Sequence, residues 1–150
     1  MVELLLTDII LRLVIAAVLG ALVGLEREVH RLPAGLKTHA LVCLGAALFT
    51  LASIQFSILD DRVTLGLLAT GVVSGIGFLG AGVIFSDKKG VHGITTAATI
   101  WTVAALGLVI GIGHYVMAII AALIIYAVLI LGTFFEKNFL HEKRLERVGN

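Results

Sequence analysis

Charged residues are scarce in this 150-residue chain, and that scarcity narrows its class. Asp, Glu, Lys and Arg make up 14% of the residues, against about 25% in soluble domains. Hydrophobic residues make up 59%, and the mean hydropathy is +1.11. This composition excludes an ordinary soluble domain and indicates a protein of the lipid bilayer. The net charge of +1 provides no broad basic field, so we expect no nucleic-acid partner.

Cysteine and catalytic motifs are also scarce. Cys43 has no disulfide partner and is expected to pack as a small hydrophobic residue. The chain lacks a serine nucleophile elbow, an HExxH zinc motif and a cysteine pair, and its histidines lack ligand spacing. Gly75, Gly77 and Gly80 match GxGxxG but lie in an apolar run without a preceding strand. We therefore expect no enzymatic activity, no cofactor and no bound metal.

Long apolar runs dominate what is present. A helix needs roughly 20 residues to cross a hydrocarbon core about 30 Å thick, and five segments qualify: 4–25, 38–59, 63–85, 94–113 and 115–135. The first begins at once and contains Asp8 and Arg12, so we expect it to be retained rather than cleaved as a signal peptide. The prediction is an all-α, polytopic transmembrane helical bundle of about five spans over residues 1–135, with a short cytoplasmic tail at 136–150.

Basic residues orient the bundle, because short cytoplasmic loops carry an excess of Lys and Arg. Placing the first, third and last connections inside puts nine basic residues in the cytoplasm and only Arg62 outside. The N-terminus is therefore predicted outside and the C-terminus in the cytoplasm.

Glycine predicts how the spans meet, since small residues let membrane helices approach closely. The third segment carries glycines on two faces: Gly71, Gly75 and Gly82 lie on one face, and Gly66, Gly77 and Gly80 lie on the other. The first segment carries two further candidates for helix packing, Gly20 and Gly24. We expect the third segment to be packed on both faces, although glycine is simply common in membrane helices. The fifth segment lacks glycine from 115 to 131 and is expected to be the most lipid-exposed.

A weak internal repeat accompanies these segments. A shift of 58 residues superposes residues 34–48 on 92–106 and pairs Gly24 with Gly82. The two units would form a parallel repeat about an axis along the membrane normal, but biased composition also produces such matches by chance.

A charged stretch follows the first segment. The predicted functional polar cluster comprises Glu26, Arg27, Glu28, Arg31, Lys37, Thr38 and His39. A basic anchor for lipid phosphates is one interpretation, but interleaved acids would repel phosphates, so we favour a specific ion-paired cluster. We expect Glu26 to accept from Arg31 or Lys37, which leaves Arg27 free for lipid phosphate or a partner protein.

Two further polar groups fall within the spans. Asp8 and Arg12 have the spacing of a helical ion pair, and Arg12 lies about 21 Å from the cytoplasmic end. They form either a functional pair within the membrane or an interfacial pair in which Arg12 reaches outward. The fourth segment carries four threonines whose hydroxyl groups could be structural or could line a polar pathway: Thr95, Thr96, Thr99 and Thr102. The indole of Trp101 on the same segment is expected to point elsewhere.

Four stretches together resemble one family. These are "LRLVIAAVLGALVGLERE" (11–28), "AGLKTHALVCLGAALF" (34–49), "GIGFLGAGVIF" (75–85) and "VHGITTAATIWTVAALGLVIG" (91–111). In sequence and order they resemble the signature blocks of the MgtC/SapB family of bacterial inner-membrane proteins. The resemblance implies a multi-pass protein of the plasma membrane linked to low-magnesium and acid adaptation and to virulence. It also implies a short form without the soluble C-terminal domain of longer members.

Three functions remain open. The first, which we favour, is a regulator that binds another inner-membrane protein, for which the resemblance suggests the F-type ATP synthase. The second is a transporter or channel for magnesium or another small cation, although no carboxylate lies near the midplane to coordinate one. The third is a purely structural homo-oligomer.

Overall fold

The computed structural model describes residues 5–59, 65–88, 90–136 and 138. Within these residues, five α-helices and one short β-hairpin follow one another: α1 (Leu6–Val29), α2 (Leu36–Leu59), α3 (Leu65–Gly82), β1 (Phe85–Asp87), β2 (Gly90–His92), α4 (Ile94–Ile112) and α5 (Tyr115–Phe135). The predicted all-α bundle is confirmed. The acidic turn at 60–62 and most of the predicted tail lie outside the described residues.

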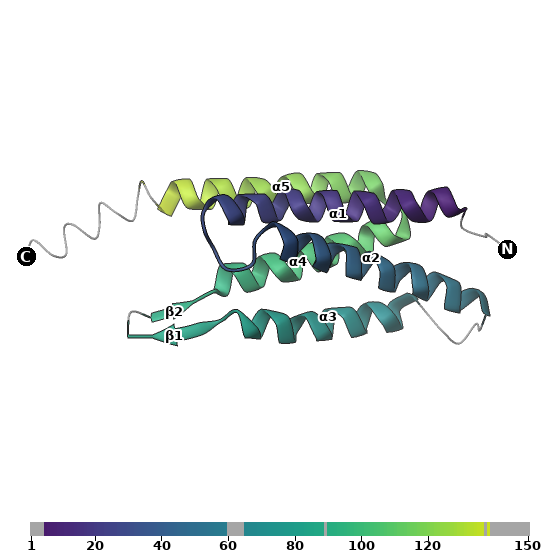
Figure 1. Ribbon diagram of the computed structural model, residues 1–150, viewed down its shortest axis with the longest axis horizontal. Coiled ribbons are helices and arrows are strands. Elements are labelled where there is room, and N and C mark those ends of the chain that lie inside the picture. The colour runs from purple at the N-terminus through teal and green to yellow at the C-terminus, as the bar shows by residue number, and fades with distance from the viewer. Residues whose placement is uncertain (1–4, 60–64, 89, 137, 139–150) are drawn as a thin grey trace, which may run out of the picture.

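The helices lie side by side along the long axis of the molecule (Figure 1). Helix α4 packs against α1, α2, α3 and α5, whereas α3 and α5 lie on opposite sides of the bundle. The α1–α2 loop, the β-hairpin and the end of α5 share one end of the molecule, as the predicted topology requires (Figure 1). Which end faces the cytoplasm stays a prediction.

Length and composition support the membrane assignment. Helices α1, α2, α4 and α5 are each long and apolar enough to cross a bilayer. Helix α3 has 18 residues, which gives a length of about 27 Å, close to the hydrocarbon thickness of about 30 Å. The chain is therefore a polytopic helical membrane protein with four clear candidate spans and a fifth, shorter helix beside them.

A buried apolar core lies between α1, α2 and α4. Its fully buried side chains include Ala16, Cys43, Ala47, Val103 and Ile110. Cys43 packs as the small hydrophobic residue that the sequence predicts. Three of these five side chains are alanine or cysteine, and such small residues let membrane helices approach closely.

Glycine contacts show where the helices are closest. A Cβ atom at Gly20 would lie 2.6 Å from the carbonyl oxygen of His39, and one at Gly24 would lie 2.7 Å from that of Gly35. Gly107 brings α4 equally close to α2, since a Cβ there would overlap the carbonyl oxygen of Cys43. The packing roles of Gly20 and Gly24 are confirmed, and Gly107 is an addition.

The two-sided packing predicted for the third segment is wrong within this chain. A Cβ atom at Gly71, Gly75, Gly77 or Gly82 would meet nothing within 4 Å, and one at Gly80 would make an ordinary 3.5 Å contact with Ala97. The reason is position: α3 lies at the edge of the bundle, and its main contacts are with α4 and α2.

Two other expectations can be compared with the fold. Helix α5 has the smallest buried share of the four candidate spans, but most described residues of α3 are exposed as well, so the greatest lipid exposure of the fifth segment stays a prediction. Helix α4 begins 58 residues after α2, and α3 begins 59 residues after α1. The spacing of the helices therefore agrees with the 58-residue repeat.

Candidate functional site

The candidate site lies where α1, α2 and α4 meet, near the end of the bundle predicted to face the cytoplasm. The loop at 30–35 returns the chain from α1 to α2, with positive φ angles at Arg31 (54°) and Ala34 (59°). The close contact at Gly24 then leaves no room for a side chain between the helices. As a result, polar side chains near the ends of α1 and α2 are directed into the bundle toward α4.

Arg27 is the central cation of this region. Its side chain is 5% exposed, and Nη2 donates a hydrogen bond to Oγ1 of Thr96 on α4 over 3.2 Å. Nη1 lies 3.6 Å from Oε2 of Glu26, while Nε has no hydrogen-bond partner among the described residues. Because a buried charge is costly without a partner, Glu26 and Thr96 must supply most of its compensation.

Glu26 is the matching buried anion. Its side chain is 3% exposed, and Oε1 lies 3.1 Å from Nδ1 of His30. The same Nδ1 lies 2.9 Å from the main-chain oxygen of Glu26. Neither carboxylate oxygen accepts a hydrogen bond within the described part of the chain. The attraction between its charge and that of Arg27 therefore holds the Glu26 carboxylate in place, rather than hydrogen bonds to its two oxygens.

His39 connects α2 to α4 from a fully buried position. Its Nδ1 donates to the carbonyl oxygen of Gly35 at 2.9 Å, because a carbonyl can only accept. Its Nε2 lies 3.1 Å from Oγ1 of Thr99, and that hydroxyl also donates to the carbonyl oxygen of Thr96 at 2.8 Å. Thr96 and Thr99 thus present two adjacent hydroxyl groups, one to α1 and one to α2.

The remaining predicted cluster residues lie outside this buried set. Glu28 is exposed, and its Oε2 accepts the main-chain N–H of Leu36 at 2.8 Å. This bond satisfies one of the free N–H groups at the start of α2. Arg31, Lys37 and Thr38 are exposed. Glu28 therefore orders the loop, and the other three face the surroundings.

Two predicted contacts are wrong. Glu26 pairs with Arg27 and His30 rather than with Arg31 or Lys37. Arg27 is buried and bonded to Thr96 rather than free for lipid or a partner. The physical reason is that Gly24 draws α1 against α2, which turns Arg27 inward toward α4.

Arg12 occupies a second polar position near the opposite end. Nη1 donates to the carbonyl oxygen of Gly111 at 2.7 Å, and the guanidinium lies beside Gly113. The last carbonyls of a helix lack internal partners and favour a cation. Arg12 therefore stabilises the C-terminal end of α4 by donating to one of these carbonyls. No ion pair joins it to Asp8 in the described chain, and the predicted Asp8–Arg12 pair is wrong.

The hydroxyl stripe on α4 is only partly as predicted. Thr96 and Thr99 are buried, Thr102 is partly buried and bonds the carbonyl of Thr99, and Thr95 is exposed. Trp101 is half exposed and makes none of the hydrogen bonds that join the buried threonines to α1 and α2. The sequence did not identify Thr96 as the partner of Arg27, nor His30 as the neighbour of Glu26.

The buried set has a defined chemical character. It holds one carboxylate, one guanidinium, one imidazole and two hydroxyl groups: Glu26, Arg27, His39, Thr96 and Thr99. We call this set the buried polar cluster. Among the residues that the structure describes, no three His, Cys, Asp or Glu side chains are grouped as metal ligands.

Fold and site together define a polytopic helical membrane protein whose three inner helices are joined by a buried polar cluster. The model of the MgtC family matches residues 13–138, and this chain belongs to that family.

Curated relatives agree with this membership. The chain is 47% identical to "Protein MgtC" of Salmonella typhimurium (strain LT2) over 122 residues, which covers 81% of this chain and 51% of that protein. It is 38% identical to "Putative magnesium transporter YhiD" of Escherichia coli (strain K12) over 138 residues, which covers 88% of this chain and 63% of that protein. The chain thus spans between half and two thirds of the length of these relatives. No solved structure matches it.

Proposed function

We propose that this chain is a non-enzymatic protein of the bacterial inner membrane that acts in magnesium homeostasis by contacting another membrane protein. Membership of the MgtC family and the names of its relatives support the link to magnesium. By the family resemblance, the F-type ATP synthase is the partner to test first, with adaptation to low magnesium, acid and host infection as the setting.

The observation that carries this proposal is the interior of the bundle. Arg12 and Arg27 place a guanidinium near each end, and Ala16, Val103 and Ile110 belong to the apolar core between them. A guanidinium repels a magnesium ion, and an apolar constriction resists hydration. The buried polar cluster therefore serves cohesion of the helices better than passage of a divalent cation.

The outer surface supports contact with a partner. Helix α5 exposes a long apolar face that includes Val116, Leu123 and Val128, and α3 exposes Phe78. In a bilayer these faces meet lipid or another transmembrane helix, and helix association there depends on packing and small residues. A partner can therefore dock without any change in the buried polar cluster.

Photo-crosslinking in cells tests the proposal. A photoreactive amino acid is placed on three helices, at Leu22, Phe78 and Leu123, each of which is exposed. We expect at least one position to give an adduct that contains a subunit of the ATP synthase, and growth in low magnesium to require the chain. Absence of such an adduct at all three positions, with normal amounts of the protein, would contradict the proposed partner.

Magnesium flux into proteoliposomes separates this proposal from transport. We expect vesicles containing the chain to take up magnesium no faster than empty vesicles, with an ionophore as the positive control. Uptake that saturates with magnesium, in folded protein at equal reconstituted amounts, would favour the transporter instead.

A further inference from the structure

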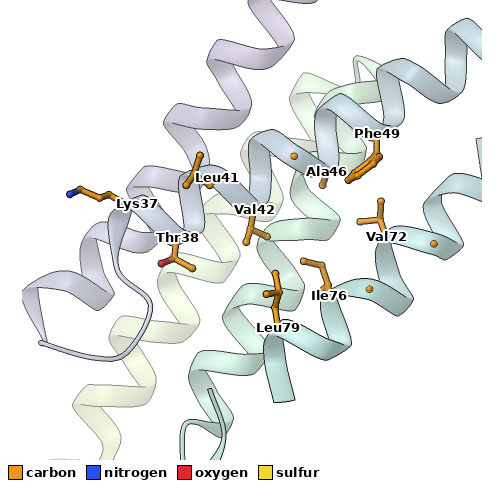
Figure 2. Close-up of a pocket in the computed structure, with 12 residues that line it drawn as sticks. Lys37, Thr38, Leu41, Val42, Ala46, Phe49, Val72, Ile76 and Leu79 are labelled. Atoms are coloured by element: carbon orange, nitrogen blue, oxygen red, sulfur yellow. The ribbon is translucent and has the colours of Figure 1, made fainter. Parts of the chain in front are cut away.

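A groove runs between α2 and α3, and none of the residues of the buried polar cluster lines it (Figure 2). Its volume is about 690 Å³. The apolar side chains of Val42, Ala46 and Phe49 on α2 line one wall, and those of Val72, Ile76 and Leu79 on α3 line the other. Phe49 and Leu79 are about half exposed, so the groove opens to the surroundings of the protein along its side.

Glycines keep this groove open. Gly45 of α2 and Gly71 and Gly75 of α3 line it, and a Cβ atom at any of the three would meet nothing within 4 Å. This differs from Gly20, Gly24 and the other glycines between the inner helices, which are required for backbone contact. Packing within the chain therefore does not require glycine at these three positions. A molecule bound in the groove would require it, because larger side chains there would fill the space.

The length of the groove matches one leaflet of a bilayer. It extends along α2 from Lys37 to Phe49, which is about 18 Å at 1.5 Å per residue. Half of a hydrocarbon core is about 15 Å. The groove therefore reaches from one membrane surface to near the midplane and does not cross the membrane.

The polar groups of the groove lie at one end. Lys37 and Thr38 lie beside the α1–α2 loop, at the end of the bundle predicted to face the cytoplasm (Figure 2). Lys37 is exposed, and no carboxylate among the described residues forms an ion pair with it. The nearby Glu28 carboxylate is already bonded to the N–H of Leu36. An apolar channel with a cation at its membrane-surface end fits an amphiphile with an anionic head.

We propose that this groove binds an anionic phospholipid of the leaflet predicted to be cytoplasmic, with one acyl chain between α2 and α3 and the headgroup phosphate beside Lys37 and Thr38. The ammonium of Lys37 attracts the phosphate, as basic residues at a membrane surface do. The hydroxyl of Thr38 can donate a hydrogen bond to a phosphate oxygen. The site is independent of the partner proposed above.

The length of the groove favours an acyl chain over a second transmembrane helix. An acyl chain ends near the midplane, as the groove does. A transmembrane helix crosses the whole hydrocarbon core of about 30 Å and would extend about 12 Å beyond the inner end of the groove.

Photoaffinity labelling in vesicles tests the acyl-chain site. The probe is phosphatidylglycerol with a photoreactive group in one acyl chain, and the protein is the full chain reconstituted at equal amounts. We expect labelled peptides from α2 and α3, and about tenfold less label in Gly75→Leu, which corresponds to about 1.4 kcal/mol. The matched control is Gly77→Leu, because Gly77 is equally open but lies outside the groove. Its labelling should equal that of the wild type.

The headgroup is tested with a second pair of variants. In Lys37→Gln we expect phosphatidylglycerol to label the groove no better than a phosphatidylcholine probe of the same chain length. Lys88→Gln, which alters an exposed lysine on the β1–β2 turn at the same end of the bundle, should keep the preference for the anionic probe. Equal labelling of the wild-type groove by both probes would overturn the anionic assignment.

Two results would overturn the proposal as a whole. One is labelling of α2 and α3 that is undiminished in Gly75→Leu, since a filled groove cannot hold a chain. The other is a dimer in nanodiscs that Gly75→Leu, but not Gly77→Leu, converts to monomers, which would show that the groove holds a second copy. Thermal stability of each variant in detergent, compared with the wild type, ensures that only folded protein is scored.

Discussion

Arg27 of α1 donates to the hydroxyl of Thr96 on α4, and this bond joins residues 69 positions apart in the chain. Arg27 also balances the buried charge of its neighbour Glu26. The two contacts make Arg27 a structural residue of the bundle interior. Its removal should therefore act first on folding and only through folding on function.

We predict that Arg27→Gln lowers the thermal stability of the protein in detergent. Removing one member of a buried ion pair leaves an unmatched charge, which costs about 3–5 kcal/mol. The double variant Glu26→Gln/Arg27→Gln should recover part of this loss, because neither charge remains. The exposed Arg31→Gln should melt like the wild type. An unaltered melting temperature in Arg27→Gln would show that the pair carries no folding energy.

Thr96→Val should destabilise the bundle more than Thr95→Val does. The change keeps the shape but removes the oxygen that accepts from Arg27, and leaving a buried donor unsatisfied costs about 1–3 kcal/mol. Thr95 is the adjacent exposed hydroxyl and makes a close control. Chemical denaturation of both variants in mixed micelles measures the difference. Equal stabilities would mean that another acceptor replaces Thr96.

Leucine at glycine positions should separate the inner helix contacts from the outer ones. Gly24→Leu is expected to prevent stable folding, since its Cβ atom would lie 2.7 Å from the backbone oxygen of Gly35. Gly75→Leu, which a tightly packed third segment would not tolerate, should fold normally because nothing lies within 4 Å. Size-exclusion profiles and melting temperatures provide the comparison. Loss of fold in Gly75→Leu would show that α3 is packed on that face after all.

Arg12→Gln should loosen the junction between α4 and α5. The guanidinium is the donor that satisfies the carbonyl of Gly111, and hydrogen exchange of the amides at 110–115 should become faster without it. Asp8→Asn is the control, since Asp8 forms no ion pair with Arg12. If Asp8→Asn accelerates exchange as much as Arg12→Gln, the two residues act as a pair under the conditions of the experiment.

The predicted sidedness is tested by reporter fusions. A fluorescent protein that matures only in the cytoplasm, fused after Asn150, should be bright, because the basic loops share that end of the bundle. A periplasmic reporter at the same position should be inactive. The reverse result would place the α1–α2 loop, and with it Lys37, on the outer face.

Much of the fold could be predicted from the sequence because apolar run length alone determines where membrane helices lie. The predicted segment 94–113 and the observed α4 (Ile94–Ile112) differ by one residue at one end. The β-hairpin was predicted only as a polar loop, since each strand has three exposed or partly exposed residues and leaves almost no hydrophobic pattern.

The partners within the candidate site could not be predicted in the same way. The sequence located the charged stretch and offered Arg27, Arg31 and Lys37 as cations for Glu26, but it could not show which of them is buried beside the carboxylate. The actual contacts depend on how α1 is rotated against α2 and α4, which Gly20, Gly24 and Gly107 determine together. The placement of glycines on two faces likewise predicted that the third segment is packed on both faces, whereas a Cβ atom at Gly71, Gly75, Gly77 or Gly82 would meet nothing within 4 Å.

The hydroxyl of Thr99 has a single proton but faces two acceptors, Nε2 of His39 and the carbonyl oxygen of Thr96. With a neutral imidazole, whose one proton is donated to Gly35, that hydroxyl can bond only one of them at a time. The carbonyl oxygen of Thr96 lies inside α4, where it also accepts the main-chain N–H four residues later. The hydroxyl of Thr99 can therefore turn to His39 without leaving a backbone acceptor bare, and the contact between α2 and α4 has two alternative hydrogen-bonding arrangements.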